Sequence, residues 1–287
     1  MKKISMIVSS IVLLANTITA QETNDKKVRF GLKVTPTPTW MRSSEPKLVE
    51  NGGAKFGFGF GLQVEFALTS TASFVTGIGG DFLGGKQTYN SSQGYALSKD
   101  NSSYIDYKNI DFGKDAQGIN SSNNNGYNFY ELKSRSIKTT YITVPILLKL
   151  MTKDISGFKY FGIFGGNIAV QTKYRCNDDL TRLSYDIINN VYVTADNLTV
   201  QDMRPTGDLI PVNVALNVGL GAEYNLAGNT SVFLSINYIR GFINQYQPSS
   251  QIMVDNMKTN LNFKGMPSGS KQSAFSDGLQ INVGILF

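Results

Sequence analysis

The chain has 287 residues, with 27 Lys and Arg against 21 Asp and Glu, no histidine and one cysteine. The charges are scattered along the sequence, which argues against a nucleic-acid-binding surface. A single cysteine excludes an internal disulfide, and we expect Cys176 to be a free thiol in a polar loop. The chain also lacks the side chain that most often serves as a general base near neutral pH. We therefore predict a protein that is not an enzyme and that holds no cofactor and no metal.

The first 20 residues are typical of a secretory signal peptide. Lys2 and Lys3 precede a short apolar run over 4–15, and the segment ends in polar and small residues at Ala20. The apolar run is too short for a membrane-spanning helix, which needs roughly 20 residues. We expect cleavage after Ala20, followed by a short periplasmic segment over 21–27. Loss of the two lysines leaves 25 of the 27 basic residues against 21 acids.

Eight segments carry the signal of a β-strand, in most of them as an alternation of apolar and polar residues. The fifth, Phe158–Val170, is apolar or glycine on both faces, so its pattern does not decide its orientation. The clearest is the second, where apolar residues occupy every other position from Phe56 to Leu68, opposite mostly glycine and polar residues. Such a row of phenylalanines is poorly suited to water and well suited to lipid. The last segment alternates in the same way and ends at the aromatic Phe287. The eight predicted strands cover residues 28–41, 56–68, 73–83, 137–150, 158–170, 212–226, 231–240 and 279–287.

The connections between these strands alternate in length. Three are short, at 69–71, 152–157 and 227–230, whereas the others are long and polar, at 42–55, 84–135, 171–210 and 243–274. Long loops at one end and short turns at the other are typical of transmembrane barrels. We predict that residues 28–287 form an eight-stranded antiparallel up-and-down β-barrel with short periplasmic turns and long extracellular loops. A soluble β-sandwich explains the alternation but neither the phenylalanine face nor the loop asymmetry.

The composition of the longest connection predicts little burial. Residues 84–135 are rich in Asn, Ser, Gly and Tyr. A segment with so few aliphatic side chains buries little apolar surface, so we expect it to be solvated or mobile.

The strand Tyr141-Ile-Thr-Val-Pro-Ile-Leu-Leu-Lys-Leu150 resembles the aromatic-x-x-x-Pro-Leu-Leu-Leu-Lys signature of the PorT-like outer-membrane barrels of Bacteroidetes. Val218–Tyr224 and Ile236–Gly241 resemble the penultimate hairpin of the same family. The similarity covers most of the predicted strands and none of the long loops. One departure is Asn237, where the family often has arginine. The resemblance implies a place in the outer membrane of a Gram-negative cell and an accessory role in protein secretion of the type IX kind.

Charged residues on the inner face are the first candidates for a functional site. Glu65 and Glu223 each precede a short turn by four residues and Lys149 precedes one by three, so the three lie at one depth. Arg29 and Lys33 lie near the start of the first strand, at the same end. We expect all five to form an ion-paired cluster that closes the periplasmic mouth, because a lone buried charge is costly. A proton or ion gate is the alternative interpretation.

Two further sites follow from position alone. Arg240 is predicted to point outward near the external rim, where its guanidinium could contact a lipopolysaccharide phosphate. Asp178 and Asp179 form an adjacent acidic pair in the third long connection, which we expect to be solvated charge, with a calcium site as the alternative.

Three functions are consistent with these features. The first is a non-enzymatic envelope scaffold whose long loops bind a partner, either another envelope or secretion protein or an external ligand. The others are a small-solute pore and a surface adhesin that acts through its loops. An eight-stranded interior is just wide enough for side chains to fill it, which disfavours a wide channel. The expected partners are outer-membrane lipid and lipopolysaccharide, and no nucleic acid.

Overall fold

The computed structural model describes most of the chain after the predicted signal peptide. The signal peptide and the 21–27 segment lie outside the described residues. In the described part, no helix is long and apolar enough to cross a membrane. The described residues are 28–90, 92–110, 127–186, 188–189, 191–205, 207–263 and 269–287.

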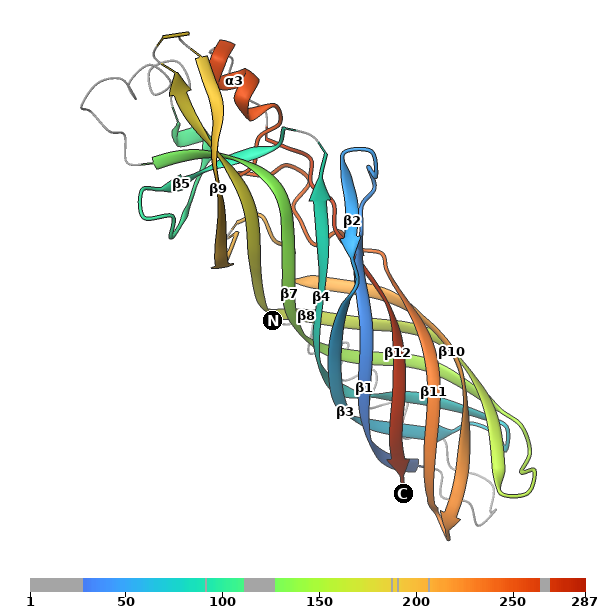
Figure 1. The fold of residues 1–287 in the computed structure, drawn as a ribbon. Helices are drawn as coiled ribbons and strands as arrows, with labels where there is room; N and C mark the ends of the chain where they lie inside the picture. The colour runs from blue at the N-terminus through green and yellow to red at the C-terminus, as the bar shows by residue number, and fades with distance from the viewer. Residues whose placement is uncertain are drawn as a thin grey trace, which may run out of the picture.

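Eight antiparallel strands close into a ring, in which each strand pairs with its neighbours along the chain and the first strand pairs with the last. Closure removes every free edge from the ring. The predicted eight-stranded up-and-down barrel of the transmembrane type is therefore confirmed (Figure 1). In order around the ring the strands are β1 (Val28–Arg42), β3 (Lys55–Ala67), β4 (Ala72–Tyr89), β7 (Tyr127–Met151), β8 (Phe158–Asp186), β10 (Val212–Ala227), β11 (Thr230–Gly241) and β12 (Phe275–Leu286).

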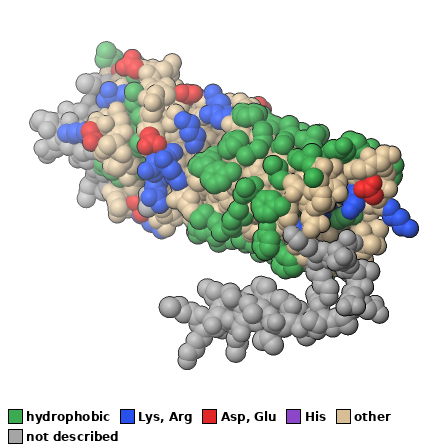
Figure 2. Space-filling view, turned by 90° about the horizontal axis from the view of Figure 1, so that it is seen from below, with side chains coloured by type: hydrophobic (Ala, Val, Ile, Leu, Met, Phe, Trp, Pro, Cys, Tyr) green, Lys and Arg blue, Asp and Glu red, His purple; other side chains and the backbone are tan. Residues whose placement is uncertain are grey.

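The outside of the ring carries a band of exposed apolar side chains, which we call the apolar belt. On β3 the large exposed side chains are phenylalanines and a leucine, and Phe56 is 77% exposed. Figure 2 shows the apolar side chains gathered over the barrel, with charged side chains toward both ends. Lipid solvates such a surface and water does not. The belt consists of Phe30, Leu32, Val34, Phe56, Phe58, Phe60, Leu62, Ile78, Phe82, Ile142, Val144, Ile146, Leu148, Phe164, Ile168, Val170, Val218, Leu220, Leu234, Ile236, Leu279, Val283 and Ile285.

The three short connections all lie at one end of the barrel, which we call the turn end. They join β3 to β4, β7 to β8 and β10 to β11, as predicted. Gly157 and Gly228 have φ of 85° and 57°, a backbone region that glycine enters without strain. The carboxyl-terminal residue lies at the same end, where Phe287 exchanges backbone hydrogen bonds of 2.8 and 3.0 Å with Phe30 (Figure 1).

At the opposite end, the loop end, the structure corrects the prediction. Strand β4 continues to Tyr89, β7 begins at Tyr127 and β8 runs to Asp186, each well past its predicted limit. β7 and β8 extend beyond the barrel and are joined there by further strands (Figure 1). We call this extension the loop-end sheet. Its additional elements are β2 (Val49–Gly53), β5 (Gly94–Ser98), β6 (Tyr104–Ile105), a 3₁₀ turn η1 (Tyr107–Asn109), β9 (Val191–Met203) and α3 (Met257–Phe263).

Residues 84–135 are expected from their composition to bury little apolar surface. This expectation is wrong for the described residues of the segment, and residues 111–126 lie outside the described part of the chain. Tyr95, Leu97, Tyr130 and Leu132 are all buried in one hydrophobic cluster. The connection from β11 to β12 completes this cluster with residues such as Met253. Tyrosine supplies the apolar area that aliphatic side chains supply elsewhere, because its ring buries as a hydrophobe while its hydroxyl finds a polar partner.

The seam between the first and last strands is held partly by side chains. β1 pairs with β12 over Gly31–Val34 and again over Thr39–Arg42. Pro36 and Pro38 lie between these stretches, and proline has no N–H to donate. Across the gap the Thr35 hydroxyl donates to Asn282 Oδ1 at 3.0 Å. The ring therefore closes through backbone pairing at both ends of the seam and a side-chain hydrogen bond in its middle.

Inward glycines make room for large inward side chains. A Cβ on Gly284 would lie 2.5 Å from the ring of Phe233 and 2.5 Å from the Leu32 carbonyl oxygen. A Cβ on Gly221 would lie 2.5 Å from the ring of Phe161. Phe161, Phe233 and the inward Leu286 form an apolar layer inside the barrel.

We expect Gly284→Ala to destabilise the folded barrel by about 1–3 kcal/mol, because its methyl group overpacks this layer. Unfolding in urea, followed by the mobility difference between folded and unfolded protein on cold gels, measures the loss. Gly162→Ala is the matched control, since a Cβ there meets its nearest neighbour at 3.7 Å. Equal midpoints for the two variants would contradict this packing.

Candidate functional site

Four charged side chains from four strands form a closed network at the turn end. Arg29 of β1 contacts Glu223 of β10 and donates to Glu65 of β3, with Nη2 to Oε1 at 2.9 Å. Lys149 Nζ of β7 lies 3.0 Å from Glu65 Oε2 and 2.7 Å from Glu223 Oε2. Each cation thus contacts both carboxylates, and the network is neutral. Only Arg29 keeps appreciable exposure, with 19% of its side chain accessible. The ion pairs offset the cost of burying these charges and occupy the mouth of the barrel.

Lys33, the fifth residue predicted in this cluster, is not among these ion pairs. Arg29 is in register with Glu65, whereas Lys33 is in register with Gly61 on one side and Gly284 on the other. Four residues along a strand carry a side chain roughly 13 Å further from the turn end. Lys33 instead borders a small void that it shares with Asp81, which accepts a 2.6 Å hydrogen bond from Thr143.

Uncharged polar side chains lie beside Lys33 and Asp81 in the middle of the barrel. Asn237 donates to Asn217 at 2.8 Å, and Asn217 donates to Asn167 at 3.2 Å, so one amide chain crosses three strands. Asn282 accepts from Thr35 and donates to Ser235 at 3.1 Å. Because these groups hydrogen-bond to one another, the interior is polar without being open.

Two voids that border Lys33 inside the barrel are each about the size of one water molecule. The void between Lys33 and Asp81 has a volume of about 20 Å³, and the void between Lys33 and Lys149 about 10 Å³. A cavity needs roughly 10–15 Å³ to hold one water. Neither of these voids is wide enough to serve as an aqueous channel.

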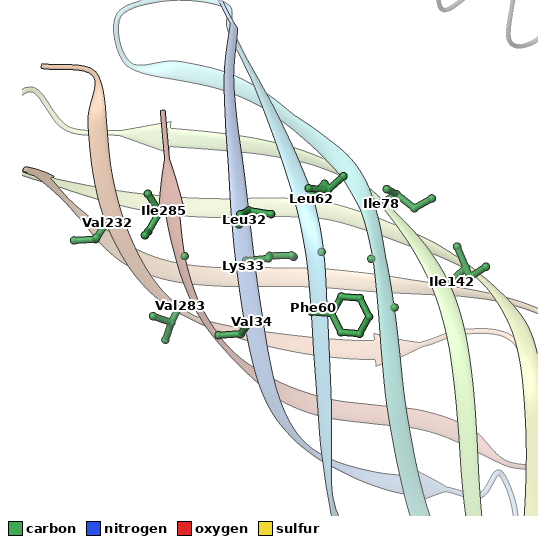
Figure 3. A pocket seen from close by; sticks show the side chains of 14 residues that line it. Leu32, Lys33, Val34, Phe60, Leu62, Ile78, Ile142, Val232, Val283 and Ile285 are labelled. Atoms are coloured by element: carbon green, nitrogen blue, oxygen red, sulfur yellow. The ribbon is translucent and has the colours of Figure 1, made fainter.

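The outer wall has a shallow groove of about 930 Å³ within the apolar belt (Figure 3). It lies where the outward-facing Gly80 leaves the wall without a side chain, and it is bordered by Leu32, Phe60, Leu62, Ile78 and Ile285. Its lining is almost wholly apolar, so an acyl chain of the surrounding lipid suits it and a polar ligand does not.

The loop-end sheet is organised around one buried ion pair. Arg135 of β7 and Asp178 of β8 are paired across the two strands, and their side chains are 1% and 0% exposed. Arg135 donates twice, from Nε to Oδ1 at 2.8 Å and from Nη2 to Oδ2 at 2.7 Å. A bidentate pair of this kind fixes orientation as well as distance.

Tyrosines from other segments complete the coordination of this pair. The hydroxyls of Tyr95 and Tyr104 donate to Asp178 Oδ2 at 2.6 and 2.9 Å. Arg135 Nη1 donates to the Tyr246 hydroxyl at 3.4 Å. Burial raises the pKa of Tyr95 well above its usual value, so its hydroxyl stays protonated and keeps donating. The network ties β5, β6 and the β11–β12 connection to the projecting β7–β8 ribbon.

Asp178 and Asp179 do not form the solvated acidic pair that was predicted. They lie in strand β8 and point to opposite faces, so only Asp179 faces outward, where it accepts from Ser134 at 2.6 Å and Thr199 at 3.0 Å. Among the described residues, no group of His, Cys, Asp and Glu side chains is arranged to hold a metal ion.

Arg240 lies on the outward face of β11, one residue before that strand ends at the loop end, and is exposed. This is the position expected from the sequence. Contact between its guanidinium and a lipid phosphate stays a prediction.

Comparison with known proteins identifies no family for this chain. No family model matches it, and no curated protein matches it. Solved structures that align include Neisserial surface protein A, at 10% identity and a TM-score of 0.35, covering 90% of this chain and 97% of the other. OprG of Pseudomonas aeruginosa aligns at 12% identity and a TM-score of 0.33, covering 93% and 99%. Ail of Yersinia pestis aligns at 9% identity and a TM-score of 0.29, covering 91% and 99%. At these low values the fold assignment rests on the strand pairing itself.

We expect Lys149→Ala to destabilise the barrel by about 3–5 kcal/mol, because it leaves two buried carboxylates facing a single arginine. The drop in thermal melting temperature measures this effect, and Glu65→Ala should lower the melting temperature in the same way. Lys153→Ala, an exposed lysine in the adjacent turn, is the control. Melting curves that coincide for Lys149→Ala and Lys153→Ala would show that the network carries no stability.

The prediction that Cys176 lies in a polar loop is wrong. The residue is buried in β8, and its Sγ lies 3.4 Å from the Met203 carbonyl oxygen. Burial raises the pKa of this thiol to about 12. Since the thiolate is the nucleophile, we expect negligible alkylation of the folded protein at pH 8 and full alkylation after unfolding.

The same shift has a consequence for stability. The folded state retains the thiol proton at a pH where the unfolded chain releases it. The contribution of Cys176 to stability is therefore complete below about pH 9 and is lost as the pH approaches 12.

Mass spectrometry after iodoacetamide treatment measures the alkylation of Cys176 in the folded and unfolded protein. Rapid labelling without unfolding would contradict the burial of Cys176.

Proposed function

We propose that this chain is a non-enzymatic integral protein of a Gram-negative outer membrane, closed to solutes, that presents its loop-end sheet outward as a rigid partner-binding scaffold. The single observation that carries this proposal is the contrast between the barrel and the loop-end sheet. The barrel interior is filled, whereas the loop-end sheet has a core of its own beyond the apolar belt.

The filled interior favours a scaffold over a pore. The neutral network of Arg29, Glu65, Lys149 and Glu223 occupies the turn end, and the amide chain through Asn217 crosses the middle. A pore needs a continuous hydrated path, and the voids found here each hold about one water.

The loop-end sheet favours binding over a role as an inert anchor. A barrel needs only short connections to close. In this chain, β7 and β8 are 25 and 29 residues long, and they extend beyond the apolar belt into a sheet that contains the buried Arg135–Asp178 pair. Recognition surfaces gain affinity when they are rigid before binding, because less entropy is lost on association. An adhesin that acts through this surface is a special case of the same proposal.

The resemblance of Tyr141–Leu150 to PorT-like barrels supports a narrower version, in which the partner is another envelope component of protein secretion. Crosslinking in intact cells, with the captured proteins identified by mass spectrometry, tests it. A reproducible envelope partner supports this version, and capture of lipopolysaccharide alone counts against it.

We expect no stable conductance when the purified protein is inserted into planar lipid bilayers. The physical reason is that the ion-paired network and the amide chain occupy the described interior. Recordings from protein-free bilayers give the background, and mobility on cold gels verifies that the inserted protein is folded. A stable, sizeable conductance from folded protein would favour the pore and overturn the closed scaffold.

A further inference from the structure

A polar cleft of about 550 Å³ opens on the loop-end sheet. Its walls come from the β5–β6 hairpin and the residues after it, from β8, from the end of β9 and from the β11–β12 connection. The polar residues used below are Asp106, Arg175, Asp202, Arg204 and Gln251. Its volume lies within the range of roughly 300–1,000 Å³ typical of small-ligand sites.

The cleft is balanced in charge, with two arginines and two aspartates among its lining residues. A site for an anion needs an excess of cations, and a site for a metal needs several converging carboxylates. An apolar ligand would leave charged groups buried without hydrogen bonds. A ligand that is neutral overall and has closely spaced hydrogen-bond donors and acceptors can bind the arginines and the aspartates at the same time. The hydroxyl groups of a sugar have this chemistry, since each of them both donates and accepts.

A β-bulge directs Asp202 into the cleft. Opposite Asn177 of β8, strand β9 carries two residues, so the register shifts between Cys176 and Asp178. Asp202 has φ of 56°, in the left-handed region that disfavours a non-glycine residue. Its N–H donates to Asn177 Oδ1 at 3.0 Å, and its carboxylate lies 3.3 Å from Arg175 Nε. Bulges often aim a side chain at a binding site, and this one leaves 76% of the Asp202 side chain accessible.

The opposite wall is equally fixed. The Gln251 N–H donates to Asp208 Oδ1 at 2.7 Å, and its carbonyl accepts from Tyr107 at 3.0 Å. The Asp106 carboxylate accepts from the Lys108 N–H at 2.9 Å. Both walls are therefore held by hydrogen bonds to backbone groups, and the cleft is preorganised.

We propose that this cleft binds a neutral saccharide at the cell exterior. Asp202 and Asp106 accept hydrogen bonds from sugar hydroxyls, Arg175 and Arg204 donate to them, and the Gln251 amide does both. This assignment rests on the proposed function, in which the loop-end sheet faces outward.

Binding is tested on the full chain, folded in a detergent without a sugar headgroup. Saturation-transfer NMR is run with glucose, galactose, lactose and N-acetylglucosamine at millimolar concentration. We expect transfer to at least one of them, and an affinity that falls about tenfold in Asp202→Asn, which loses a charge-assisted hydrogen bond. Asp196→Asn is the matched control, because Asp196 is an exposed residue of the same strand. No transfer to any sugar, or an equal affinity in both variants, overturns the proposal, as does tighter binding of inorganic sulfate.

A separate measurement distinguishes failure of the site from failure of the proposed function. Cells that express Asp202→Cys are treated with a membrane-impermeant maleimide, and the buried Cys176 gives a low background. Labelling of intact cells supports an outward-facing cleft. Labelling only after lysis overturns the outward orientation, while the NMR result still reports on the cleft itself.

Discussion

Every backbone N–H and C=O that enters the hydrocarbon of a membrane needs a partner within the protein, and this constraint shapes the molecule. A ring of strands meets it only if the first and last strands pair. The most demanding place is the seam between β1 and β12, where Pro36 and Pro38 supply no donors. The structure compensates there with the side chains of Thr35 and Asn282. Closure of the ring then forces the alternation of faces, because each side chain points either to lipid or to the narrow lumen.

The narrow lumen explains the pairing of small and large residues on its surface. Where one strand presents glycine, a neighbouring strand presents a bulky group, as Gly284 does for Phe233 and Gly219 for Asn237. Asn237 stands where the resembling family often has arginine. Here its amide joins the polar chain through Asn217, so the middle of this barrel is filled by a neutral group. At the turn end the charges are matched, with two cations and two carboxylates in one ion-paired network.

The sequence predicted the ring well because lipid imposes a strict pattern. Large apolar side chains at every second residue of β3 are stable in lipid and costly in water, and the turns are marked by short polar stretches. Depth along a strand was harder to predict. Lys33 and Arg29 share a face, but register with β3 places only Arg29 beside a carboxylate. Such a register depends on pairing with a distant segment, which the local pattern does not contain.

The loop-end sheet escaped prediction because side chains usually expected at the surface are buried in its core, beside aliphatic ones such as Leu97. Tyrosine, arginine and aspartate are expected to be solvated when each is taken alone. In the fold, Tyr95, Arg135 and Asp178 satisfy one another and become buried together. A buried network of this kind is specified by contacts between segments far apart in the sequence, so composition is a poor guide to it.

A single bulge marks the passage from lipid to water. Thr140 is in register with Lys173 but Tyr141 with Gln171, so Thr172 of β8 is an extra residue. Below it odd-numbered residues of β8 such as Asn167 face inward, and above it even-numbered ones such as Tyr174 do.

On β7 the exposed side chains change at the same level, from Ile142 in the apolar belt to Lys138 beyond it. Without this break, continued alternation along β8 would place Cys176 on the outer face, whereas it is buried. The bulge therefore lets β7 and β8 continue from lipid into water. Their apolar residues face outward within the membrane and inward beyond it.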